Sequence, residues 1–163
     1  MKLIGSGILL CTGILAGCAA AKKLERRAAI LRLLRHLLTA MMQELRNTLP
    51  LTADLLRLLA DMPAFGCLTF LQQAAAYPDS FPQNWSDAVH ADPALTPDTA
   101  AVLETVGQTL GSTALDGQLA ALRLCQERLG DLQKSAEKLA AEKGTLYRSM
   151  GILCALFFVI LLL

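Results

Sequence analysis

The stretch from Leu115 to Leu163 decides the fold of this chain; it reads LDGQLAALRLCQERLGDLQKSAEKLAAEKGTLYRSMGILCALFFVILLL. Apolar residues recur in it at alternating gaps of three and four, which predicts one face of a long, coiled-coil-like helix. That seam consists of Leu122, Cys125, Leu129, Leu132, Ala136, Leu139, Leu146 and Met150, with Lys143 interrupting it. No charged residue follows Met150, and the chain ends in FFVILLL. The stretch therefore predicts one helix that begins in water and ends in a bilayer.

The composition extends this prediction to the whole chain. Of its 163 residues, 54% are hydrophobic and only 5% are aromatic, and the mean hydropathy is +0.45. Leu and Ala dominate, which favours helix over sheet. We expect an all-α fold: a small helical bundle of about six helices, whose long N- and C-terminal helices continue into transmembrane segments. The expected parts are a transmembrane helix over 1–21, a cytoplasmic helical domain over 22–148 and a C-terminal transmembrane helix over 149–163.

A second apolar segment, Leu3 to Ala21, lies at the start of the chain. It carries no charge and is long enough to cross a bilayer core of about 30 Å. Four glycines lie in it, at positions 5, 7, 13 and 17. Small residues of this kind occur where membrane helices touch, and they are also tolerated in helices that face only lipid. The sequence leaves both readings open.

Charge is divided sharply along the chain and sets the expected orientation. Residues 22–49 hold seven basic residues against two acidic ones, and residues 121–148 hold six against four. Residues 50–120 hold eight acidic residues and one basic residue. Basic residues that flank a span stay on the cytoplasmic side. We therefore expect both termini outside, residues 22–148 in the cytoplasm, lipid headgroups as partners of the basic blocks, and an acidic pole free to meet a basic partner.

A competing prediction comes from Leu15-Ala16-Gly17-Cys18, which matches the lipobox of a bacterial lipoprotein signal. Cleavage before Cys18 would leave a lipidated Cys18 and export everything after it. The basic cluster that begins at Lys22 opposes export. This alternative makes the protein an exported lipoprotein that acts as an envelope binding module.

Between the two spans the pattern predicts further helices. The first helix continues with Leu24, Leu31, Leu34, Leu38, Met41 and Leu45 on one face, and it ends before Pro50. The two long helices carry apolar seams that could pack antiparallel. Four shorter helices are expected between them. The first runs from Thr52, its N-cap, to Met62, and the second covers residues 64–77 with Phe65, Leu68, Leu71 and Ala75 on one face. The third runs from Pro82 to Ala91 and holds Trp85, and the fourth runs from Thr96, its N-cap, to Gly111, its C-cap.

No motif supports catalysis, a cofactor or a metal. The five cysteines and two histidines show no paired spacing, which excludes common zinc motifs and fits buried thiols in a reducing compartment. The segment from Gly107 to Gly111 follows no predicted strand and lacks the lysine of a phosphate-binding loop. The basic residues lie beside the spans without interleaved aromatics, so nucleic acid is not an expected partner. The sequence predicts a protein that is not an enzyme.

Several segments of the chain form a distinctive set: Met1-Lys2-Leu3-Ile4-Gly5, Leu24-Glu25-Arg26-Arg27, Gln43-Glu44-Leu45, Leu49-Pro50-Leu51, Gly107-Gln108-Thr109-Leu110-Gly111 with Asp116 and Gln118, and residues 143–151, KGTLYRSMG. Together they resemble the stage III sporulation protein AB family of endospore-forming bacteria. The chain departs from the family pattern at Thr113-Ala114-Leu115, where a more polar turn is expected.

The resemblance implies a non-enzymatic platform in the channel between the mother cell and the forespore, in the mother-cell membrane that faces the forespore. The family's soluble part is similar to the cytoplasmic domains of the type II secretion and type IV pilus platform protein F. The implied partners are other stage III sporulation proteins, a cytoplasmic secretion ATPase (the AA protein) and a second copy of the chain. The residues it singles out for fold or contact roles are Glu44, Gln108, Thr109, Gly111, Asp116 and Gln118.

Overall fold

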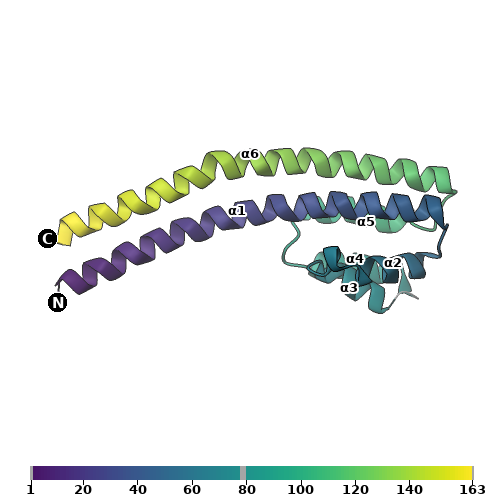
Figure 1. The fold of residues 1–163 in the computed structure, drawn as a ribbon, viewed down its shortest axis with the longest axis horizontal. Helices are drawn as coiled ribbons and strands as arrows, with labels where there is room; N and C mark the ends of the chain where they lie inside the picture. The colour runs from purple at the N-terminus through teal and green to yellow at the C-terminus, as the bar shows by residue number, and fades with distance from the viewer. Residues whose placement is uncertain (1, 78–79, 163) are drawn as a thin grey trace. The chain divides into compact units, whose positions relative to one another are not determined.

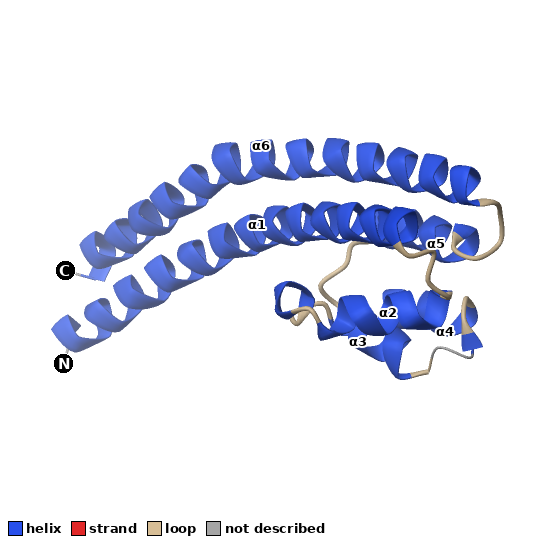
Figure 2. Cartoon of the chain, turned by 45° about the vertical axis from the view of Figure 1, so that its right-hand side comes forward, coloured by secondary structure: helices blue, strands red, loops and turns tan. Residues whose placement is uncertain are grey.

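In the part that it describes, the computed structural model consists of helices joined by loops and turns, as Figures 1 and 2 show. It describes the backbone of residues 2–77 and 80–162, and the side chains of 18–77, 80–144, 146, 149, 150 and 153. The elements are α1 (Lys2–Asn47), α2 (Thr52–Asp61), the 3₁₀ helix η1 (Pro63–Phe65), α3 (Thr69–Ala76), α4 (Gln83–Ala91), α5 (Pro97–Thr109) and α6 (Leu115–Leu162). Residues 2–77 and 80–162 contain no strand. The predicted all-α class with about six helices is confirmed.

The chain divides into two compact units. The core unit is Ile30–Leu132, and the terminal-helix unit is Met1–Ala29 with Gln133–Leu163. Within the described residues, no helix combines the length and the hydropathy needed to cross a membrane. The predicted spans, Leu3–Ala21 and 149–163, fall mostly on residues whose side chains lie outside that part, so both spans stay predictions.

In the core unit, α1 and α6 run antiparallel to each other. Gln126 Nε2 donates to Thr39 Oγ1 over 2.7 Å. A β-carbon at Gly130 would lie 3.5 Å from Cζ of Arg35, so the guanidinium group passes across α6 at this glycine. Arg35 precedes Thr39 by four residues and Gly130 follows Gln126 by four, which is the register of an antiparallel pair. The predicted pairing of the two long helices is thus seen in this unit.

The apolar seam of α6 is buried or half-buried from Leu122 to Leu139. Its buried members are Leu122, Cys125, Leu129 and Ala136. Leu132 and Leu139 are half-buried, whereas Leu146 is 55% exposed and Met150 is 52% exposed. The change falls at Lys143, whose charge interrupts the seam. Burial of the seam within the chain thus ends at Leu139, and the seam at Leu146 and Met150, which lie at the start of the predicted C-terminal span, stays a prediction.

The short helices pack around the only tryptophan of the chain. Trp85 is fully buried, and its Nε1 donates to the Leu103 carbonyl oxygen over 2.7 Å. The rings of Phe70 and Phe81 meet it edge-on, at centroid distances of 5.4 and 6.2 Å. Such aromatic clusters combine a large buried area with a fixed geometry. This cluster holds α3, α4 and α5 together.

Two predicted details of the short helices are wrong. Thr52 is the first helical residue of α2 rather than its N-cap, which is Leu51, and no side chain caps the helix. The predicted helix over 64–77 is divided into η1 and α3, because Leu68 has an extended backbone (φ −90°, ψ 92°). A new helix starts after it since Asp92 Oδ2 accepts hydrogen bonds from Thr69 Oγ1 (2.6 Å) and from the Phe70 amide (3.3 Å). Asp92 thus caps α3 from a distant part of the chain.

Candidate functional site

Five of the six residues that the sequence singled out lie at or beside the α5–α6 turn of the core unit. Gly111 has φ +75°, a conformation that glycine adopts without steric strain. A β-carbon there would lie 2.9 Å from Oγ1 of Thr52, so the turn rests against the start of α2. The carbonyl oxygen of Thr109 accepts hydrogen bonds from the amide (3.2 Å) and hydroxyl (3.0 Å) of Ser112. The C-cap of α5 is Leu110, so the predicted C-cap role of Gly111 is wrong by one residue. Gly111 instead takes the third position of the type II turn from Thr109 to Ser112 that follows the helix, where φ is positive.

The start of α6 is tied back to the same turn. Gln118 Nε2 donates to the Thr113 carbonyl oxygen over 2.7 Å, so this side chain satisfies an acceptor in the turn. Asp116 lies in the first turn of α6 and is exposed, where a carboxylate is favoured by the helix dipole. Gln108 is exposed on α5. Of these residues, Gln108 and Asp116 alone present an exposed side chain.

Glu44 lies apart from this turn in the sequence, near the end of α1. Its carbonyl oxygen accepts hydrogen bonds from the amide (3.0 Å) and the hydroxyl (3.1 Å) of Thr48, which close the last turn of the helix. Its side chain is half-buried. Glu44 therefore contributes through its backbone to the end of α1.

Among the residues with described side chains, no group of three His, Cys, Asp or Glu residues could hold a metal ion. Cys125 is buried on α6, and its Sγ donates weakly to the Val102 carbonyl oxygen at 3.8 Å. Burial raises the pKa of this thiol, an effect that the charge of Arg128 partly opposes. A buried, protonated thiol is a packing group rather than a nucleophile.

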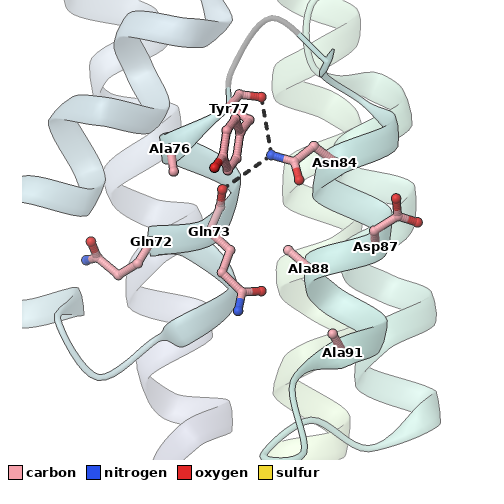
Figure 3. Close-up of a pocket in the computed structure, with 8 residues that line it drawn as sticks. All are labelled: Gln72, Gln73, Ala76, Tyr77, Asn84, Asp87, Ala88 and Ala91. Carbon is pink, nitrogen blue, oxygen red and sulfur yellow. Dashed lines mark hydrogen bonds between the residues drawn. The ribbon is translucent and has the colours of Figure 1, made fainter.

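An open groove of about 560 Å³ lies between α3 and α4 (Figure 3). Asn84 Nδ2 crosses one end of it and donates to the carbonyl oxygens of Gln73 (3.3 Å) and Tyr77 (3.2 Å). The remaining lining consists of Gln72, Ala76, Asp87, Ala88 and Ala91. The lining thus combines amides, alanines, one carboxylate and the Tyr77 phenol, and Asn84 serves here to join the two helices.

The sequence reasoning missed an exposed apolar surface on α2. Leu51 is 75% exposed and Leu58 is 44% exposed, although the helix buries Leu55, Leu56 and Leu59 on its other side. Leu51 is the N-cap residue at the start of α2, and Leu58 lies about two helical turns after it. Asp54 and Asp61 lie on the same side and are exposed. These four residues, Leu51, Asp54, Leu58 and Asp61, are called the outer face of α2 below.

Comparison with known proteins identifies the family. The family model of stage III sporulation protein AB matches residues 2–163. No curated protein and no solved structure has significant similarity to the chain.

Because that match covers nearly the whole chain, the protein belongs to the stage III sporulation protein AB family. The resemblance inferred from its sequence segments is confirmed, and the chain has a role in sporulation.

Proposed function

We propose that this member of the stage III sporulation protein AB family is a non-enzymatic membrane platform of the channel between the mother cell and the forespore. The observation that carries the proposal is the fixed register of α1 and α6 in the core unit, where Gln126 binds Thr39. The α1 helix (Lys2–Asn47) and the α6 helix (Leu115–Leu162) each continue without a break into a predicted membrane span. A rigid pair of this kind suits a protein that positions others.

The proposed topology has spans over 1–21 and 149–163 in the mother-cell membrane that faces the forespore. The domain over 22–148 is then cytoplasmic. Its support is the basic charge beside both spans, which the positive-inside rule keeps in the cytoplasm and which anionic lipid headgroups attract.

The proposed partners are other stage III sporulation proteins, among them a cytoplasmic secretion ATPase, and a second copy of the chain. Support comes from the excess of acid over residues 50–120, which favours partners with basic surfaces. We assign partner contact to Gln108 and Asp116, which are exposed. Fold roles are assigned to Glu44, Thr109, Gly111 and Gln118, whose backbone or side-chain groups close helix ends.

Deletion of the chain from a spore-forming host tests the platform role. We expect development to stop after engulfment, with earlier stages intact and few heat-resistant spores. A complementing wild-type copy restores the spore count. Normal spore yield in the deletion strain would refute the proposal.

The mass of the mature protein from sporulating cells separates the platform from the lipoprotein alternative. An intact N-terminus supports two spans and a cytoplasmic domain. A species that begins at Cys18 with added acyl mass would instead place the core unit outside the cytoplasm, and would exclude a cytoplasmic ATPase as its partner.

A further inference from the structure

Exposed leucines gather at the junction of α1 and α2. Leu49 is 65% exposed, Leu51 is 75% exposed and Leu58 is 44% exposed, all within ten residues of chain. Single exposed leucines are ordinary on protein surfaces, but a group of large apolar side chains on one element indicates an interaction surface. The outer face of α2 and the adjoining Leu49 form such a group.

The backbone at Leu49 gives an independent reason to examine this surface. Leu49 has φ +46°, a conformation that is uncommon for a residue with a bulky side chain. The fold therefore holds a leucine in a strained conformation and leaves its side chain in solvent. Local strain of this kind gathers at binding and functional sites.

The charges beside these leucines indicate the chemistry of the occupant. Asp54 and Asp61 alternate with Leu51 and Leu58 along the outer face of α2, and both are exposed. Arg57 lies beyond them on one side of the helix and is exposed too. It is the only basic residue against eight acidic ones in residues 50–120. The two leucines thus lie in one row along the surface, and the two aspartates lie in the row beside it, on the side towards Arg57.

We propose that Leu49 and the outer face of α2 bind an amphipathic helix of a partner protein, one that carries apolar residues at helical spacing flanked by lysine or arginine. The apolar residues of that helix lie between Leu51 and Leu58, and its cations lie beside Asp54 and Asp61. An anionic bilayer is disfavoured because it would repel the two carboxylates. A second copy of α2 is disfavoured because it would bring four carboxylates together. The inference rests on the proposed platform function and names the surface and partner chemistry through which it acts.

Photocrosslinking in sporulating cells tests the proposal with the full chain. Leu58 is replaced by p-benzoylphenylalanine, and Leu124 of α6, which is 51% exposed, receives the same replacement as a matched control. The cross-linked peptides are identified by mass spectrometry after proteolysis. We expect position 58 to capture a segment with net positive charge and apolar residues at spacings of three and four, and position 124 not to capture it.

Charge reversal sharpens the test. Asp54→Lys with Asp61→Lys should lower the yield of the position-58 cross-link about tenfold, because two favourable charge pairs become repulsive. Asp98→Lys, which reverses an exposed acid on α5, should leave the yield unchanged. Capture of another copy of the chain, of lipid, or of an acidic segment would overturn the proposal. A yield at position 58 no higher than at position 124 would overturn it as well.

Spore counts separate failure of this inference from failure of the proposed function. If deletion of the chain blocks sporulation but position 58 captures no basic helix, the platform function stands and the docking surface is wrong. If deletion leaves spore yield normal, the platform function itself fails.

Discussion

The indole ring of Trp85 lies directly on Gly107. A β-carbon at Gly107 would overlap the ring and lie 2.9 Å from its Nε1, the atom that donates to the Leu103 carbonyl oxygen four residues earlier on α5. A glycine within a helix ordinarily destabilises it by about 1 kcal/mol relative to alanine. Here the absence of a side chain is what allows α4 to approach α5.

Gly107→Ala should therefore destabilise the core unit despite its better helix propensity. Overpacking against a buried, rigid ring costs about 1–3 kcal/mol, which exceeds the gain in propensity. Denaturant unfolding of the purified full chain, followed by circular dichroism, measures the change. Gly66→Ala is the matched control, because a β-carbon there meets its nearest neighbour at 3.6 Å and φ is −59°. Equal stability of the two variants would contradict the role assigned to Gly107.

Gly111→Ala should cost about 1–2 kcal/mol, since alanine resists a positive φ. Part of the loss comes from contact with Oγ1 of Thr52 rather than from the backbone. Adding Thr52→Ala removes the contact but not the unfavourable φ. We expect the double variant to recover only part of the lost stability in the same unfolding assay; full recovery would mean that the backbone conformation contributes nothing.

Asp92→Ala should loosen the start of α3. The carboxylate accepts from Thr69 and Phe70 through Oδ2 and from the Ala94 amide (2.9 Å) through Oδ1, so its removal leaves three donors to find water. The expected loss of unfolding free energy is about 1–2 kcal/mol. Hydrogen exchange should locate the loss, with faster exchange at Phe70 and Leu71. Asp98→Ala provides the comparison, and a similar change in exchange there would argue against a specific cap.

Cys125 should resist alkylation while Cys67, which is exposed, reacts readily. The raised pKa of the Cys125 thiol means that it stays protonated in the folded chain at pH values where an unfolded thiol ionises. The unfolded state then binds fewer protons than the folded one, so this thiol lowers stability as pH rises through its unfolded pKa. Maleimide labelling with peptide mapping measures both thiols across pH. Rapid labelling of Cys125 in folded protein near neutral pH would contradict its burial.

The hydrogen bond between Gln126 and Thr39 should appear as a coupling energy. Thr39→Val and Gln126→Leu together should cost less than the sum of the two single changes, with a coupling of about 1 kcal/mol. Gln118→Leu combined with Thr39→Val is the control cycle, in which the effects should add. Additivity in both cycles would show that the contact does not stabilise the pair.

Helix ends that are determined by neighbouring residues in the sequence could be predicted. Pro50 ends the first helix region, Pro97 follows Thr96 at the start of α5, and Gly111 takes the left-handed conformation after its end. The break at Leu68 escaped prediction because its cause, Asp92, lies more than twenty residues away and acts through the folded chain.

The candidate site shows the same division. The α5–α6 turn contains Gly111, and Gln118 of α6 is hydrogen-bonded to it. All of these residues are close together in the sequence, so the sequence segments could indicate this turn. The outer face of α2 was not found, because α2 holds leucines on both sides and only packing reveals that Leu51 and Leu58 remain outside.

The register of α1 against α6 also constrains which insertions and deletions this protein can tolerate during evolution. The Thr39–Gln126 hydrogen bond lies one helical turn from the contact between Arg35 and Gly130. A residue inserted into one helix between these two contacts rotates the rest of that helix by about 100° about its axis. Side-chain adjustments alone cannot then restore both contacts. Natural variants of this chain should therefore gain or lose length in these helices in matched pairs, and a solitary insertion in one of them should be rare among functional descendants.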